Sequence, residues 1–255
     1  MENEIRNALI NLIERCSNIV FFGGAGVSTE SGIPDFRSET GLYNAQTKYG
    51  CAPEELISHS YFVKNPESFF AYYKENLLFP DAKPNKAHLA LAKLEERGKL
   101  KAIVTQNVDG LHQLAGSRTV HELHGSVLRN YCLKCSATYD LAYILDEANC
   151  VDQAGKKGSV PYCVKCGGMV RPDVVLYEES LSMQVMIEAE TAIRKADMLI
   201  VGGTSLVVYP AAGFLNYFKG DHLVLINKSK TGYDYRAELV INEAIGEVLG
   251  EVALD

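Results

Sequence analysis

Short, uninterrupted apolar runs between helical stretches are the feature that most restricts the fold of this chain. Strands that are apolar on both faces are typical of parallel sheets covered by helices on each side. Stretches with helical periodicity, among them residues 4–16, Lys86–Arg97 and Gln184–Lys195, alternate with the runs. The pattern predicts βαβ units and an α/β fold with a doubly wound parallel sheet. The expected strands are Ile19–Phe22, Ala102–Thr105, Met198–Val201, Leu223–Ile226 and, as a fifth candidate, Leu239–Ile241.

Two segments do not follow this alternation, and we expect them to form a smaller domain beside the sheet. Residues 43–80 are rich in aromatic side chains with an apparently helical pattern. Residues 130–172 hold five of the seven cysteines. The main domain is then assembled from residues 1–42, 81–129 and 173–255.

Four of these five cysteines form two Cys-x-x-Cys pairs, and Cys150 stands apart from them. Two such hairpins can present four thiolates to one tetrahedral Zn²⁺, and a full shell of four cysteines makes that zinc structural rather than catalytic. The alternatives are four unliganded thiols or a redox dithiol; two separate pairs make the redox dithiol the weaker of these. The expected metal ligands are Cys132, Cys135, Cys163 and Cys166.

Charge and hydropathy exclude some classes of function. The net charge of −7 argues against a protein that binds nucleic acid directly, because affinity for phosphate backbones depends mainly on Lys and Arg. No apolar run approaches the ~20 residues that cross a bilayer. The acidic start of the chain lacks a basic and apolar export signal. We therefore expect a cytoplasmic protein without membrane contacts, and we favour a monomer.

A glycine-rich loop follows the first expected strand. Gly23-Gly24-Ala25-Gly26 after Ile19–Phe22, with a turn into a helix, would aim backbone N–H groups at a pyrophosphate. A tight turn without a ligand would also use glycines, so this signal is weak by itself. The hydroxyls of Ser28, Thr29 and Ser31 and the Asp35-Phe36-Arg37 sequence add polar groups to the same loop.

Further polar clusters stand at or next to the ends of the other expected strands. Ligands of open α/β sheets bind at the carboxyl ends of strands, so these clusters predict one shared crevice. Simpler interpretations are helix caps for Asn and Asp and a structural role for a histidine. His121 and His124 could also form a metal pair, although the cysteines already account for a metal. The clusters are Gln106-Asn107-Val108-Asp109, His124-Gly125, Gly202-Gly203-Thr204-Ser205 and Asn227.

In chain order, these motifs resemble those of the sirtuins, NAD-dependent protein-lysine deacylases, of the bacterial type. The resemblance covers nearly the whole chain, and its first two motifs are long and specific to the family. It rests on Gly24-Ala25-Gly26, Ser28, Ser31-Gly32-Ile33-Pro34-Asp35-Phe36-Arg37, Thr105-Gln106-Asn107-Val108-Asp109-Gly110-Leu111-His112, His124-Gly125, the four cysteines and Gly203-Thr204-Ser205.

The resemblance implies a Rossmann-type NAD-binding domain and a small domain. Residues 43–80 would be the helical module and residues 130–172 the zinc-binding module of that small domain. NAD and an acetyl-lysine protein or peptide would meet in the cleft between the domains. The implied catalytic residues are His124, Asn107 and Asp109, and the implied peptide-binding residues are Val174, Val175 and Tyr177. The implied cofactor-binding residues are Gly24, Ala25, Gly26, Thr29, Asp35, Phe36, Arg37, Gln106, Asn107, Val108, Asp109, His124, Gly203, Thr204, Ser205, Asn227 and Ile245.

The activity implied by the resemblance is transfer of an acetyl or apolar acyl group from lysine to ADP-ribose, with release of nicotinamide, so that NAD is consumed. Sirtuins that remove acidic acyl groups carry a Tyr and an Arg three residues apart, where this chain has Phe70 and Tyr73. An acidic acyl chain is therefore not expected. Glu178 stands where the family usually has glycine, which would narrow the acyl tunnel or change which peptide is accepted.

Three other functions remain possible from the sequence. A protein ADP-ribosyltransferase would break the same bond of NAD, but a histidine base on the ribose is useful mainly for acyl transfer. A zinc-knuckle module that binds nucleic acid is disfavoured by the acidic balance. A dehydrogenase would reduce NAD, which absorbance would reveal.

Overall fold

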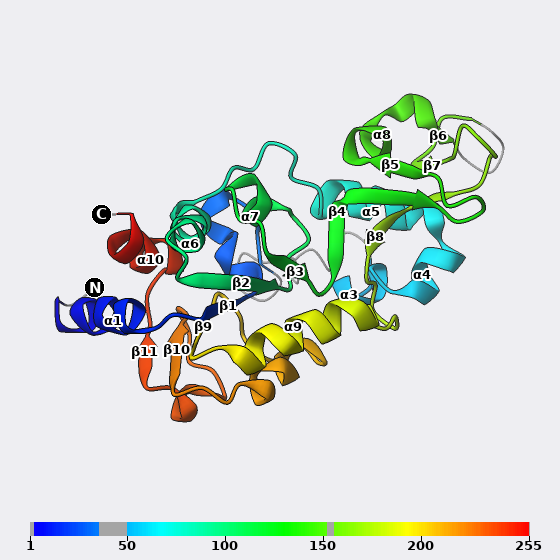
Figure 1. Cartoon of the computed structure of the whole chain (residues 1–255). Coiled ribbons are helices and arrows are strands. Elements are labelled where there is room, and N and C mark those ends of the chain that lie inside the picture. Colours follow the sequence, from blue (N-terminus) through cyan, green and yellow to red (C-terminus); the bar gives the residue numbers. More distant parts are fainter. Residues whose placement is uncertain (1–2, 36–49, 152–155, 255) are drawn as a thin grey trace.

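The computed structural model describes residues 3–35, 50–151 and 156–254 of the chain (Figure 1). Within these ranges the main layer is a six-stranded sheet whose paired strands all run parallel, in the order β11-β10-β9-β1-β2-β3. The strands are β1 (Ile19–Gly23), β2 (Leu100–Thr105), β3 (Val120–Glu122), β9 (Met198–Gly202), β10 (His222–Ile226) and β11 (Leu239–Ile241).

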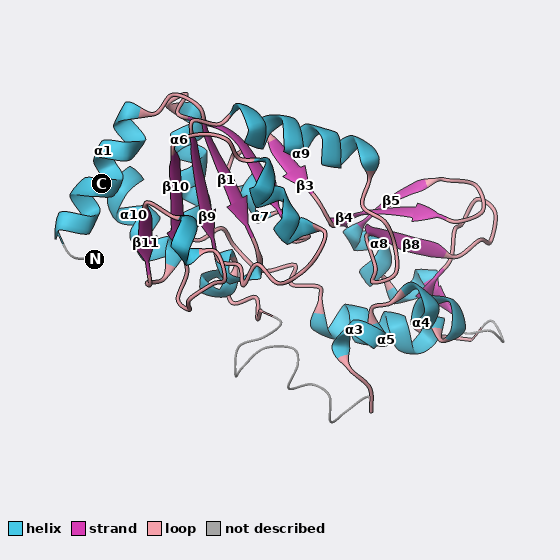
Figure 2. Ribbon diagram, turned by 90° about the horizontal axis from the view of Figure 1, so that it is seen from below, coloured by secondary structure: helices cyan, strands magenta, loops and turns pink. Residues whose placement is uncertain are grey.

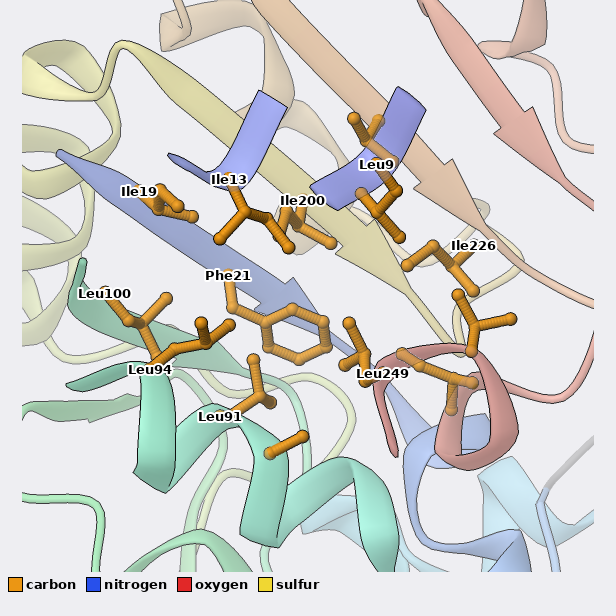
Figure 3. Close-up of a cluster of buried hydrophobic side chains, with 14 of the residues drawn as sticks. Leu9, Ile13, Ile19, Phe21, Leu91, Leu94, Leu100, Ile200, Ile226 and Leu249 are labelled. Atoms are coloured by element: carbon orange, nitrogen blue, oxygen red, sulfur yellow. The ribbon is translucent and has the colours of Figure 1, made fainter. Parts of the chain in front are cut away.

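Helices cover both faces of this sheet, as Figure 2 shows in a view from below. The helices α1 (Asn3–Arg15), α6 (Lys86–Glu96) and α10 (Ile245–Ala253) share one hydrophobic core with the sheet. In Figure 3, Phe21 of β1 lies among Leu91, Ile13 and Leu249, which come from these three helices. On the opposite face, α9 (Met183–Lys195) and the 3₁₀ helix η5 (Ala211–Tyr217) form a second core with the sheet. The fold is therefore the Rossmann-type α/β arrangement that the apolar runs and the resemblance predicted.

A smaller part of the molecule lies beside the sheet, at the right of Figure 1. One component is helical, and the other is a three-stranded antiparallel sheet of order β5-β4-β8 with a separate two-stranded sheet. A third hydrophobic core joins the two components and contains Phe62, Phe69 and Val127. The elements are α3 (Pro53–Leu56), α4 (His59–Lys64), α5 (Pro66–Asn76), β4 (Gly125–Cys132), β5 (Thr138–Asp140), α8 (Leu141–Leu145), β6 (Cys150–Val151), β7 (Val160–Pro161) and β8 (Val170–Val174).

The strands expected from the sequence are all present in the six-stranded sheet. This sheet also contains β3, which was not predicted. Its sequence, Val-His-Glu, contains no apolar run, so no sequence pattern predicted this strand. Strand β4 begins at Gly125 and thus crosses the expected limit between residues 81–129 and 130–172. The division of the chain into domains stays a prediction. No helix in the described ranges is both long and apolar enough to cross a lipid bilayer.

Candidate active site

The carboxyl ends of four neighbouring strands lie in one row of the sheet. Gly23 of β1 is paired with Thr105 of β2 and with Gly202 of β9, and Gly202 is paired with Ile226 of β10. The chain continues from β1 to β2 and β3 on one side, and later adds β9, β10 and β11 on the other. Doubly wound sheets bind ligands at the carboxyl edge where the strand order reverses in this way, which here is between β1 and β9.

A cavity of about 1090 Å³ opens at this edge. Its lining brings together the residues expected from the loops after β1, β2, β9 and β10, as well as those expected after β8. Phe36 and Arg37 lie outside the described residues. The predicted site residues that line the cavity are Gly24, Ala25, Gly26, Thr29, Asp35, Gln106, Asn107, Val108, Asp109, His124, Val174, Val175, Tyr177, Gly203, Thr204, Ser205, Asn227 and Ile245.

The glycines after β1 allow two loops to touch. A Cβ atom at Gly26 would lie 2.8 Å from Gly203 Cα, and a Cβ atom at Gly24 would lie 2.8 Å from Thr204 Cβ. The Gly26 N–H donates to the Gly203 carbonyl at 2.8 Å, so this amide is used within the protein rather than offered to a phosphate. The expected turn into a helix is wrong, because two short 3₁₀ turns, Ala25–Val27 and Thr29–Ser31, follow β1.

Ser28 connects the two polar side chains after β2. Asn107 Nδ2 donates to Ser28 Oγ at 3.0 Å, and Ser28 Oγ donates to Asp109 Oδ2 at 2.7 Å. The other carboxylate oxygen of Asp109 accepts from the Leu111 N–H at 2.9 Å. Ser28 and Asn107 are buried. Asn107 and Asp109 are thus held in fixed orientations at the cavity wall. The sequence shows the Ser28 hydroxyl in the loop after β1 but not its partners, because Asn107 and Asp109 lie in the loop after β2.

His124 has the orientation of a base. Its Nδ1 lies 2.9 Å from the Gln106 carbonyl oxygen. A carbonyl can only accept, so Nδ1 carries the hydrogen and Nε2 keeps a free lone pair. Burial lowers the pKa of His124, against the opposing effect of the Gln106 carbonyl, which favours the neutral imidazole at pH 7. His121 on β3 instead lies 3.3 Å from Glu188 of α9, so the described geometry gives no support to a shared His121–His124 metal site.

Some lining residues were missed by the sequence reasoning. Lys228 and Lys230 line the cavity beside Asn227, at the end of β10. Their position directly after an apolar strand was the available signal, because cations at strand ends can meet phosphates. Gln106 Nε2 donates to Thr204 Oγ1 at 3.1 Å, which links the loops after β2 and β9.

Residues 174–179 form the wall of the cavity at the end of β8, and the backbone of this wall is hydrogen-bonded on both sides. The Val175 N–H donates to the His124 carbonyl at 2.9 Å. The Tyr177 N–H donates to the Ile57 carbonyl at 3.1 Å, and the His59 N–H donates to the Tyr177 carbonyl at 3.0 Å. This wall therefore bridges the turn between β3 and β4 that carries His124 and the helical segment.

The four paired cysteines gather in the smaller part of the molecule. Their sulfur atoms all lie within 4.8 Å of one another. Two of the separations are 3.4 Å between Cys132 and Cys166 and 3.6 Å between Cys135 and Cys163. A tetrahedral zinc with Zn–S bonds of ~2.3 Å requires S–S distances of ~3.8 Å, so the cluster fits this ion. The Tyr139 hydroxyl lies 2.9 Å from Cys163 Sγ, as an outer partner of the site.

Comparison with protein families and curated proteins gives consistent matches. A family model described as "Sir2 family" matches residues 24–210. An NAD-dependent protein deacetylase of Clostridium perfringens is 61% identical over 253 residues, which is 99% of each chain. An NAD-dependent protein deacetylase of Clostridium acetobutylicum is 56% identical, over 96% of this chain and 97% of that protein.

Solved structures give the same result for the fold. A Sir2 protein described with a deacetylated p53 peptide and 3′-O-acetyl ADP-ribose superposes with a TM-score of 0.86 at 37% identity, covering 96% of both chains. A Sir2 complex with a p53 peptide and NAD⁺ superposes with a TM-score of 0.84 at 36% identity, covering 99% of this chain and 97% of the other.

Proposed function

This chain belongs to the Sir2 family, and we propose that it is an NAD-dependent protein-lysine deacetylase whose chemistry takes place in the cavity at the carboxyl edge of the sheet. The acetyl group of a protein lysine is transferred to ADP-ribose, and the products are free lysine, nicotinamide and O-acetyl-ADP-ribose. NAD is a consumed co-substrate. Such an enzyme needs the nucleotide pool of the cell, so we place it in the cytoplasm.

The loops after β1, β9 and β10 receive the dinucleotide. Lys228 and Lys230 give this end of the cavity positive charge for the phosphates. Ser205, Asn227 and Ile245 line the same end and contact the adenosine half. Gly24 and Ala25 line the cavity from the loop after β1, and the closeness of that loop to Gly203 keeps the phosphate site compact.

The Asn107–Ser28–Asp109 arrangement holds the nicotinamide half. The amide of Asn107 and the carboxylate of Asp109 hydrogen-bond the carboxamide and ribose hydroxyls. Because Ser28 fixes both side chains before substrate arrives, little reorganisation accompanies binding. Residues of this cavity thereby position the ribose carbon so that the acetyl oxygen of the lysine takes the place of the departing nicotinamide.

The orientation of His124 is the observation that carries the proposal. Its Nε2 lone pair, set by the Nδ1 bond to Gln106, removes a proton from a ribose hydroxyl. That hydroxyl oxygen then bonds to the acetyl carbon, and breakdown of the adduct with water leaves the acetyl group on the ribose and releases the lysine. A dehydrogenase has no need of such a base on the ribose.

The four cysteines hold a structural zinc ion in the smaller part of the molecule. All four thiolates are used, so the ion has no open position for substrate. Zinc supplies a cross-link for a sheet whose strands are short. Cys132 ends β4 and Cys163 and Cys166 precede β8, so the ion fixes the register of this strand pair.

The acyl group is acetyl or another apolar group. Phe70 and Tyr73 are buried in the third core, and neither offers a cation. Apolar side chains of the cavity, including Leu77, Val127 and Leu141, surround its peptide side. An acidic acyl chain would lose its hydration there without a compensating charge.

The decisive experiment incubates an acetyl-lysine peptide with NAD and the protein, and follows the products by mass spectrometry. Wild type should release nicotinamide and O-acetyl-ADP-ribose in equal amounts. His124→Ala should lose deacetylation by a factor of roughly 10²–10⁴, with NAD binding retained. Turnover of the peptide without NAD would refute the mechanism. Labelled ADP-ribose attached to protein, with no deacetylated lysine, would instead identify an ADP-ribosyltransferase.

A further inference from the structure

The cavity wall after β8 contains a residue with an uncommon backbone. Glu178 has a φ of 76°, in the left-handed region that glycine adopts freely and other residues rarely. A side chain at such a φ persists only where surrounding contacts outweigh the backbone strain. The contacts of Glu178 therefore identify what this residue does.

Those contacts lie in the first turn of α4. Oε2 of Glu178 accepts two hydrogen bonds from Ser60, one from the backbone N–H at 2.9 Å and one from Oγ at 2.7 Å. Backbone N–H groups in a first helical turn have no partner within the helix, so a carboxylate satisfies one of them. The Ser60 hydroxyl and amide hold the pKa of the Glu178 carboxyl below its ordinary value. The carboxylate is therefore charged at neutral pH.

The charged groups around this contact come from three elements. His59, in the same turn of α4, has its Nδ1 2.8 Å from Oε1 of Glu179. Glu179 also accepts from both terminal nitrogens of Arg171 on β8, at 2.7 and 3.0 Å. Lys64 at the end of α4 adds a positive charge near Glu178. The two neighbouring carboxylates thus have separate partners at the start of α4, because Glu179 contacts His59 and Glu178 accepts from Ser60.

The contact completes a joint between two parts of the chain that are far apart in sequence. Tyr177 is already paired through its backbone with Ile57 and His59. Glu178 adds a side-chain connection to Ser60, one residue further along. On its other side the wall is bonded through Val175 to the carbonyl of His124.

We propose that Glu178 is a positioning residue that locks the wall formed by residues 174–179 to α4, so that the edge receiving the acyl-lysine peptide is formed before the peptide binds. This inference rests on the proposed function, because that function assigns this wall to the peptide. The backbone N–H groups of Val175, Leu176 and Tyr177 are used within the protein, so the wall meets the peptide as an ordered surface. A wall that is already ordered spares the peptide the entropy of ordering it, so affinity for the peptide rises.

Steady-state kinetics with an acetyl-lysine peptide test the role in binding. Glu178→Ala should raise the KM for the peptide about 10-fold, with kcat within about 3-fold and the KM for NAD unchanged. Glu178→Gln keeps an oxygen that accepts both Ser60 donors, so it should stay within about 2-fold of wild type. Glu190→Ala is the matched control, because Glu190 pairs with Arg194 on its own helix. A wild-type KM in Glu178→Ala, or equal impairment in Glu178→Gln, would overturn the proposal.

Hydrogen exchange tests the joint without substrate. Peptides covering residues 57–61 and 175–180 should exchange about 10-fold faster in Glu178→Ala than in wild type, because the local opening becomes easier. Glu178→Gln and Glu190→Ala should match wild type. Unchanged exchange in Glu178→Ala would disprove the lock even in an active enzyme. A wild type that does not deacetylate would disprove the proposed function, and the exchange result would still decide whether the lock exists.

Discussion

Two buried histidines should make the folded protein sensitive to mild acid. His88 on α6 and His112 on α7 (Leu111–Leu114) are 0% and 1% exposed, with ring centroids 4.8 Å apart. Within the described residues, His88 Nε2 and both ring nitrogens of His112 have no hydrogen-bond partner. Burial lowers the pKa of His88 to about 4, partly opposed by Asp109, and lowers that of His112 to about 3.

The sign of the effect follows from these lowered values. Unfolded histidine has a pKa of ~6.5, so the unfolded chain takes up protons below that pH while the native protein does not. The free energy of unfolding is therefore at its full value above pH 6.5 and decreases as the pH falls toward 4. From pH 7.5 to 5.5 each histidine costs ~1.4 kcal/mol of unfolding free energy, and the pair costs ~2.7 kcal/mol.

The assay is urea unfolding followed by far-ultraviolet circular dichroism, since the chain has no tryptophan to report by fluorescence. The test variant is His112→Phe, which replaces unpartnered ring nitrogens with apolar atoms next to Phe21. Between pH 7.5 and 5.5 this variant should lose ~1.4 kcal/mol less than wild type. Comparing the two proteins at the same pH cancels any contribution of the cysteine cluster. Equal losses in both proteins would refute the reasoning.

Three further outcomes are expected. Gly26→Ala places a Cβ 2.8 Å from Gly203 Cα and should lower the free energy of unfolding by ~1–3 kcal/mol. Urea titration measures this change, and an unchanged midpoint would contradict the close approach of the loops. Gly168→Ala places a Cβ 2.9 Å from Cys132 Sγ and should reduce the zinc retained per chain in native mass spectra, whereas full zinc content would argue against the cluster as described. Burial lowers the pKa of His124, and its neutral form is the proposed base, so kcat/KM should fall on the acid side with a midpoint below ~6.5. A midpoint above that value would conflict with the environment of His124.

The sheet was predictable because its strands are buried on both faces. Continuous apolar runs mark β1, β2, β9 and β10, and polar loops at their ends mark the cavity edge. Strand β3 was not predictable, since it is three residues long and two of them are polar. It pairs with β2 by virtue of tertiary packing, which no local pattern encodes.

The composition of the site was easier to predict than its internal bonds. Asn107 and Asp109 could be selected because they follow an expected strand, and His124 because it matches a family pattern. The role of Ser28 depends on the pairing of β1 with β2, and the contact of Gly26 with Gly203 depends on the pairing of β1 with β9. Register of this kind is a property of the assembled sheet, so the sequence alone does not reveal which side chains meet.

Strand β4 connects the cysteine cluster directly to the candidate active site. It starts one residue after His124 and finishes at Cys132, so the eight residues of one strand, with a bulge between Ser126 and Asn130, join the proposed base to a thiolate. Hydrogen bonds from β4 to β8 at both ends of the strand restrict movement of one end relative to the other. A chelator that removes a zinc ion from the cysteines, without entering the cavity, should therefore also change the position of the His124 imidazole.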